Sequence, residues 1–210
     1  MNRALAAALA VFVFTLAPPA RGLSRTLRAV IAGLEVAQPR MTKATRKHYA
    51  EIIRKEAIDH SFDPLTLIAI VHFESGFNPG LIHANPPREY SVGLSQINVL
   101  AMHRSCREDL SSDACGARIA ALMDGAYNLK VAAALITANR EHCRRRTGKP
   151  ALFARWLSAF QGYDRRPGVT CNQRRDRRGR WRDLPVPSQT ARVIRYRRSL
   201  LRALRRRGLA

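Results

Sequence analysis

The segment from Ala114 to Cys143 is the strongest helical stretch of the chain. It reads ACGARIAALMDGAYNLKVAAALITANREHC and is rich in alanine and leucine, which have high helix propensity. Segments with the two-residue alternation of half-buried strands are nearly absent from the rest of the sequence. We found no internal repeat and no second group of core segments. The sequence therefore predicts a mainly α-helical fold with a single hydrophobic core.

Further helical patterns flank this stretch on both sides. Asp63 and Pro64 form the strongest start signal, because Asp is a favoured N-cap and Pro a favoured first helical residue. The segments 78–93 (NPGLIHANPPREYSVG) and 170–189 (TCNQRRDRRGRWRDLPVPSQ) are expected to be a loop and an irregular basic stretch. The segments predicted to be helical are residues 24–37, 42–60, 64–75, 152–164 and 190–208, and residues 93–104 are expected to begin a further short helical segment.

The first twenty residues have the organisation of a secretory signal peptide. Arg3 supplies a basic start, residues 4–16 form an apolar run, and small residues precede Arg21. The apolar run is too short to span a bilayer as a resident helix. We expect cleavage after Ala20 and a periplasmic or secreted protein without a lipid anchor. The alternative is a buried N-terminal helix.

The four cysteines are an even number in a chain that we expect to be exported, and they predict two disulfide bonds. Cys106, Cys115, Cys143 and Cys171 allow three pairings. Closure of the shortest loops favours Cys106–Cys115 together with Cys143–Cys171. No pair of the cysteines has CxxC spacing, so a zinc site is not expected.

Positive charge is concentrated in the C-terminal third of the chain. Residues 1–139 contain 15 basic and 11 acidic residues, a balance of +4. Residues 140–210 contain 22 basic and 4 acidic residues, a balance of +18. This distribution predicts a near-neutral body that carries specific chemistry and a cationic segment that attracts polyanions.

Glu74 is the carboxylate with the most unusual surroundings in the sequence. It comes at the end of the helix predicted for residues 64–75, with Phe73 before it and Phe77 after it. The negative end of the helix dipole and the apolar neighbours both disfavour the ionised form and raise the pKa. A proton held near neutral pH is what a general acid for glycosidic bonds requires. Taken alone, such a residue is more often a solvated surface carboxylate.

Four sequence blocks, FESGFNP, SVGLSQIN, YNL and AFQGY, follow one another between residues 73 and 163. In this order and at these distances the blocks resemble the lytic transglycosylase family (the SLT domain), whose fold is like that of goose-type lysozyme. The match spans residues 48–165. The resemblance implies a lysozyme-like single helical domain, with Glu74 as the catalytic acid and base. Asn128, in the YNL block, matches a family asparagine with a structural role.

The resemblance also implies a groove that binds the sugar strand. It places Ser91 near the reacting sugar and Gln96 and Asn98 along the groove, and Gln161 stands where the family has Asn. For Gln96 and Asn98 the alternative is capping of a helix start. Phe160 replaces the family's Tyr and lacks the hydroxyl that could hydrogen-bond the catalytic acid. This departure puts efficient catalysis in more doubt than the fold.

The reaction implied by the resemblance is cleavage of the β-1,4 bond between N-acetylmuramic acid and N-acetylglucosamine in peptidoglycan. Glu74 would protonate the bridging oxygen and then deprotonate the muramoyl C6 hydroxyl, which closes onto C1 as a 1,6-anhydro ring. This route requires no cofactor. Two alternatives stay open: a muramidase that hydrolyses the same bond with a second carboxylate such as Glu89, and an inactive module that binds peptidoglycan.

The expected partners are peptidoglycan glycan strands and, for the basic segment, an anionic wall polymer or membrane surface. Nucleic acid is not the expected partner of an exported protein. The alternative for the last helix is that it packs its apolar stripe on the domain and leaves its arginines in solvent. The predicted organisation is a signal peptide (1–20), an N-terminal helical segment (21–47), a lysozyme-like transglycosylase domain (48–171) and a basic C-terminal extension with an amphipathic helix (172–210).

Overall fold

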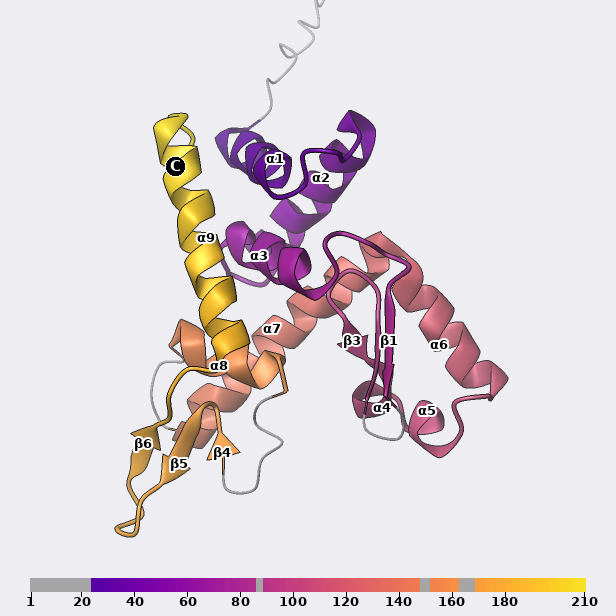
Figure 1. Ribbon diagram of the computed structural model, residues 1–210, viewed down its shortest axis with the longest axis vertical. Coiled ribbons are helices and arrows are strands. Elements are labelled where there is room, and N and C mark those ends of the chain that lie inside the picture. The colour runs from indigo at the N-terminus through magenta and orange to yellow at the C-terminus, as the bar shows by residue number, and fades with distance from the viewer. Residues whose placement is uncertain (1–23, 86–88, 148–151, 163–168) are drawn as a thin grey trace, which may run out of the picture.

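The computed structural model describes residues 24–85, 89–147, 152–162 and 169–210, and this part of the chain is mainly helical, as predicted (Figure 1). The predicted signal peptide lies outside the described residues. The helices are α1 (Arg25–Ala37), α2 (Lys43–Asp59), α3 (Pro64–Glu74), α4 (Val99–Met102), α5 (Arg104–Glu108), α6 (Asp113–Met123), α7 (Gly125–Thr147), α8 (Phe153–Phe160) and α9 (Ser188–Arg206). The strands are β1 (Ile82–Asn85), β2 (Glu89–Val92), β3 (Ile97–Asn98), β4 (Val169–Thr170), β5 (Gln173–Arg175) and β6 (Trp181–Asp183).

Helix α3 is the centre of the hydrophobic core. All its residues from Leu65 to Val71 are buried, because α1, α2, α7 and α9 pack around it. The Asp63 side chain accepts a hydrogen bond from Leu65 N (2.9 Å) and starts the helix, as the sequence predicted. An apolar helix surrounded in this way has little freedom to move. Its last residue, Glu74, is therefore held on a rigid support.

The long helical stretch predicted from Ala114 to Cys143 is not one helix, because it breaks at Asp124 into α6 and α7 with a bend of 95°. The Asp124 carboxylate accepts a hydrogen bond from Tyr127 N (2.7 Å) and so begins α7. A side chain at Gly125 would overlap the Tyr49 hydroxyl, so this close approach needs glycine. No single helix of the described residues has the length and apolar composition to cross a membrane; α6 and α7 reach these only as a bent pair.

Two short sheets lie in segments where no strand was expected. Strands β1, β2 and β3 form one antiparallel sheet within and after the predicted loop, with Ile82 opposite Val92 and Ser91 opposite Asn98. Strands β4, β5 and β6 form the second sheet, which lies below α8 at the lower left of Figure 1, away from the first sheet. Strands of two to four residues are too short to produce a clear alternation in the sequence, which is why both sheets were missed.

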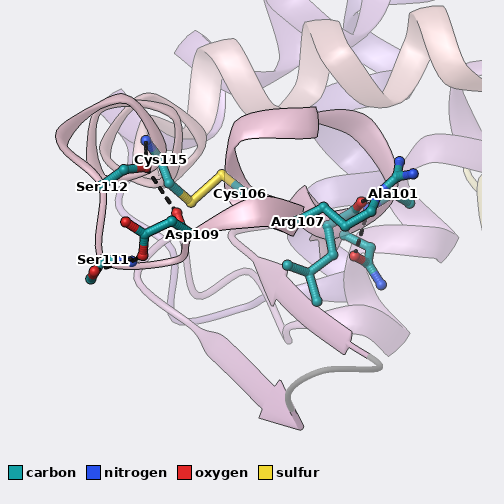
Figure 2. The surroundings of a disulfide bond; sticks show 9 residues. Ala101, Cys106, Arg107, Asp109, Ser111, Ser112 and Cys115 are labelled. Carbon is teal, nitrogen blue, oxygen red and sulfur yellow. Dashed lines mark hydrogen bonds between the residues drawn. A yellow bond between two sulfur atoms is a disulfide. The ribbon is translucent and has the colours of Figure 1, made fainter.

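The predicted disulfide pairing, Cys106–Cys115 and Cys143–Cys171, is confirmed. The first bond joins α5 to α6, beside the turn in which Ser112 caps the second of these helices (Figure 2). The second ties α7 to the turn between β4 and β5. Two disulfide bonds are consistent with an oxidising compartment.

Helix α9 is part of the core. Its residues Val193, Leu200 and Leu204 are buried, and the helix packs against α3 and α1 (Figure 1). The Tyr196 ring stacks on His72 of α3, with ring centroids 4.1 Å apart. The alternative given for this helix, packing of its apolar stripe on the domain, is therefore the one observed.

Two of the predicted domain boundaries fall inside structural units. The boundary after residue 47 lies within α2, and the boundary after residue 171 lies within the sheet β4–β6. One core cluster includes Leu27 of α1 and Leu204 of α9 together with residues of the central segment. The N-terminal and C-terminal helices are therefore built into the same body as the centre of the chain.

Removal of Cys143–Cys171 is expected to destabilise the protein more than removal of Cys106–Cys115. The two bonds join residues 28 and 9 positions apart. The chain-entropy relation predicts losses of about 3.6 and about 2.6 kcal/mol. All four cysteines are buried, so paired Cys→Ala variants leave similar cavities and serve as matched controls. Urea unfolding of both variants measures the difference, and an equal or reversed order would contradict the expectation.

Candidate active site

A cleft of about 910 Å³ lies at the end of α3. Residues of the sheet β1–β3, of α7 and α8 and of the first turn of α9 form its other walls. The structure brings all of the predicted site residues to this one cleft. They are Glu74, Ser91, Gln96, Asn98 and Gln161.

The Glu74 carboxyl group accepts hydrogen bonds from two amide side chains. Gln161 Nε2 donates to Oε1 over 3.1 Å, and Gln189 Nε2 donates to the same oxygen over 3.3 Å. Burial raises the pKa of Glu74 above its ordinary value; the hydrogen bonds from Gln161 and Gln189 act in the opposite direction, and the Glu89 carboxylate raises the pKa further. The group can thus hold a proton and also has donors ready for its ionised form.

The described lining of the cleft contains no lysine or arginine, in a chain with 37 basic residues. Its titratable side chains are Glu74, Glu89 and His83, and amide and hydroxyl groups supply most of the remaining polarity. A guanidinium beside Glu74 would stabilise the carboxylate and lower its pKa. The lining therefore suits an uncharged ligand with hydroxyl and amide groups better than a polyanion.

Ser91 is a buried residue of β2 whose hydroxyl points to a second carboxylate. Its Oγ donates to Glu89 Oε1 over 2.9 Å. Because its one proton is used in this bond, the Ser91 oxygen is left to accept hydrogen bonds from a ligand. The pair places an acceptor on the wall of the cleft formed by the sheet β1–β3.

Gln96 and Asn98 use their amides mainly to build the cleft wall. Gln96 has a positive φ of 48°, and its Nε2 donates to the carbonyl oxygens of Leu81 (3.0 Å) and Gly93 (2.9 Å). Asn98 Oδ1 accepts from Ala101 N (3.1 Å) and caps α4. Of the two interpretations, helix capping is the one observed for Asn98. Gln96 instead stabilises the loop between β2 and β3 in which it lies.

Asn128 holds the floor of the cleft in place from α7. Its Oδ1 accepts from Ser95 N (2.8 Å), and its Nδ2 donates to the carbonyl oxygens of Val92 (3.0 Å) and Leu122 (2.9 Å). Gly93 has a φ of +79°, and a side chain there would overlap the Asn128 amide. The fully buried Asn128 is therefore structural, and it fixes the turn between β2 and β3.

Two site residues were missed by sequence reasoning. Gln189 and Thr190 come from the first turn of α9, and Thr190 Oγ1 donates to Gln161 Oε1 over 2.6 Å. Gln189 ends the segment predicted to be irregular, and Thr190 begins the segment predicted to be the last helix. Nothing local relates either residue to Glu74, which lies 115 positions from Gln189. Only the packing of α9 on α3 reveals this contact. Tyr163, three positions after Phe160, lies outside the described residues.

The described residues form no metal site, and the comparisons with known proteins give no match. Within the described ranges, no three His, Cys, Asp or Glu side chains gather as a metal would require. Comparison of the chain with protein-family models, with curated proteins and with solved structures gives no match. The function is therefore inferred from the geometry of the cleft and from the sequence blocks that form it.

Glu74→Gln is expected to raise the free energy of unfolding at neutral pH. The folded-state pKa of Glu74 is raised, so wild-type stability falls as pH increases from the unfolded pKa through the folded pKa. The neutral glutamine avoids this loss and still accepts from Gln161. Unfolding by urea at about pH 3 and about pH 7 checks this, since the variant's advantage should vanish at the lower pH. Glu51→Gln, on an exposed site of α2, is the control; a variant without any gain at neutral pH would contradict the expectation.

Proposed function

We propose that this protein is a peptidoglycan lytic transglycosylase with a lysozyme-like domain, acting in the periplasm or outside the cell. The observation that carries the proposal is the environment of Glu74. Its pKa is raised, it lies at the end of a buried helix, and it faces a cleft whose described lining has no lysine or arginine. These are the properties of a general acid that works at neutral pH.

The two steps of the reaction need opposite properties of one carboxyl group. Protonated Glu74 first gives its proton to the oxygen that bridges the two sugars. The bond between C1 and this oxygen breaks, and the N-acetylglucosamine end leaves with the proton as a hydroxyl group. The resulting carboxylate takes the proton of the muramoyl C6 hydroxyl, whose oxygen bonds to C1 and closes the anhydro ring. Burial supports the first state, and the amide donors of Gln161 and Gln189 support the second. Because the nucleophile belongs to the substrate, proximity replaces a second carboxylate.

The remaining cleft supports a glycan strand as the ligand. N-acetylated sugars present hydroxyl and acetamido groups, which pair with the amides and hydroxyls of the lining. Phe160 lines the cleft and lacks the phenolic hydroxyl that the family's Tyr could use to hydrogen-bond the catalytic acid. Gln161 and Gln189 supply hydrogen bonds to Glu74 in its place. The cleft is thus equipped for catalysis, which argues against an inactive binding module.

The position of Glu89 supports a second candidate function, hydrolysis of the same bond by a muramidase. Glu89 lines the cleft together with Glu74 and contributes to the raised pKa of that group. A second carboxylate in the same cleft can activate a water molecule for attack on C1. The two functions differ in the role they give to Glu89, which is essential only for the hydrolytic route.

Glu74→Gln is expected to lower the release of muropeptides from purified sacculi by about 10²- to 10⁴-fold, because the proton donor is lost. Glu89→Gln is the matched variant. Under the proposed function it loses far less activity than Glu74→Gln, because it removes only the influence of Glu89 on the Glu74 pKa and on Ser91. Mass spectrometry then finds a product that is one water lighter than the hydrolytic product. Loss of activity in Glu89→Gln together with the heavier product would instead establish the muramidase. Sacculi that bind the wild-type protein and remain unchanged would indicate the inactive module.

A further inference from the structure

The hydrogen-bond network of Glu74 extends to a buried hydroxyl group on α9. Thr190 is fully buried, and its Oγ1 donates to Gln161 Oε1 over 2.6 Å. Ser158 of α8 is also buried; its Oγ lies 3.5 Å from Thr190 Oγ1 and donates to Ala154 O over 2.7 Å. The Thr190 proton is thus directed to the amide that contacts the candidate acid.

This hydroxyl decides which end of the Gln161 amide faces Glu74. An amide side chain has a donor end and an acceptor end of nearly the same shape. With Oε1 held by Thr190, Nε2 points to Glu74 and donates to its Oε1. Without the hydroxyl the amide can turn its oxygen to Glu74, which opposes the carboxylate and favours the protonated acid.

We propose that Thr190 is a positioning residue, which fixes the Gln161 amide so that Glu74 keeps the Gln161 donor, in addition to Gln189, after it has given up its proton. The role in turnover rests on the proposed function, whereas the effect on Glu74 does not. Other groups that face Glu74 do not provide this control. Glu89 of β2 and His83 of β1 line the cleft, and the residues with which α7, α8 and α9 line its described part are uncharged.

Thr190→Val and Thr190→Ser test the proposal, since valine keeps the shape and removes the hydroxyl whereas serine keeps it. NMR titration of ¹³C-labelled glutamate side chains reads Glu74 directly and needs no enzymatic activity. We expect Thr190→Val to raise the Glu74 pKa by about one unit, as loss of one donor to a charged group predicts, and Thr190→Ser to restore the wild-type titration. In the pH profile of kcat for muropeptide release, the limb set by ionisation of Glu74 should shift to higher pH by the same amount.

A double-mutant cycle separates this role from a general packing role. In a Gln161→Leu background the amide is absent, so Thr190→Val should produce no further shift in the Glu74 titration. If Thr190→Val does not fold, Thr190→Ala removes the same hydroxyl and takes its place in the cycle. A wild-type titration in Thr190→Val, or an equal shift with and without Gln161, would overturn the proposal. Absence of activity in the wild type would refute the proposed function and leave this result standing.

A separate feature of α9 is a row of arginines on its solvent-exposed face. The row consists of Arg195, Arg198, Arg202, Arg205 and Arg206, all exposed and spaced three or four positions apart or adjacent. At 1.5 Å per residue it is about 17 Å long. It lies opposite the buried stripe, and α9 contains no acidic residue.

Ion pairs within the described residues do not compensate this row. Two other arginines of the segment have carboxylate partners: Arg197 pairs with Asp63, and Arg207 pairs with Glu35 over 3.1 Å. The row has none among the described residues, and like charges at these spacings repel one another. The helix dipole favours cations only in the last turn, which leaves Arg195, Arg198 and Arg202 unexplained.

We infer that the arginine row binds the surface of an anionic lipid bilayer. A straight convex helix touches a plane along its whole length but offers no groove to a polymer. None of the large apolar side chains exposed in the described chain belongs to α9, so the helix contacts head groups and does not insert. The row also has no aromatic side chain on which nucleic-acid bases would stack. This inference does not depend on the enzymatic activity.

Vesicle sedimentation tests the arginine row with a charge-matched control. The triple variant Arg195→Gln, Arg198→Gln and Arg202→Gln should lower partitioning onto vesicles with about 30 mol% phosphatidylglycerol by about 100-fold. The control is the triple variant Arg174→Gln, Arg177→Gln and Arg178→Gln, which removes the same charge from exposed positions of the segment β5–β6. It should change the partitioning onto the vesicles only a few-fold. Equal losses in both variants, equal binding to neutral vesicles, or binding to soluble teichoic acid without vesicle binding would each overturn the inference.

Discussion

A carboxyl group held partly away from water without a cation beside it is the constraint on which the site depends. Burial of such a group is unfavourable when it is ionised, so the protein must supply either a counter-charge or neutral donors. A counter-charge would stabilise the carboxylate and remove the acid. At Glu74 the donors are the amides of Gln161 and Gln189, which hydrogen-bond the ionised carboxylate and, being neutral, still allow the carboxyl group to be protonated. The segregation of basic residues away from the described cleft lining follows from the same requirement.

The rigidity of this arrangement comes from the way α3 is enclosed. Helix α3 is buried along almost its whole length, and α9 locks its final turns through the stack of Tyr196 on His72. On the opposite side, Asn128 fixes the turn between β2 and β3, which forms part of the cleft wall. The candidate acid therefore lies between two supports that are part of the core. A proton donor whose position is set by packing loses little freedom when a substrate binds.

Helix α9 combines three tasks that its sequence alone does not suggest. Its apolar stripe closes the core, its first turn brings Gln189 and Thr190 to Glu74, and its outer face carries the arginine row. The strongly basic composition of the last third of the chain masks the first two tasks. A segment that looks like an appendage by charge is thus needed both for the fold and for the candidate site.

Local patterns were sufficient for most of the long helices and for the disulfide pairing, because capping, periodicity and loop length act over short distances in the chain. They failed at Asp124, where one capped turn outweighs the helix propensity on both sides, and in the two sheets, whose strands are too short to show alternation. The five predicted site residues line one cleft. Only the tertiary structure decided what surrounds the carboxyl group: Gln161 and Gln189 lie 87 and 115 positions from Glu74, and no short-range rule reaches across that distance. Their arrival depends on how α8 and α9 pack, which is a property of the whole core.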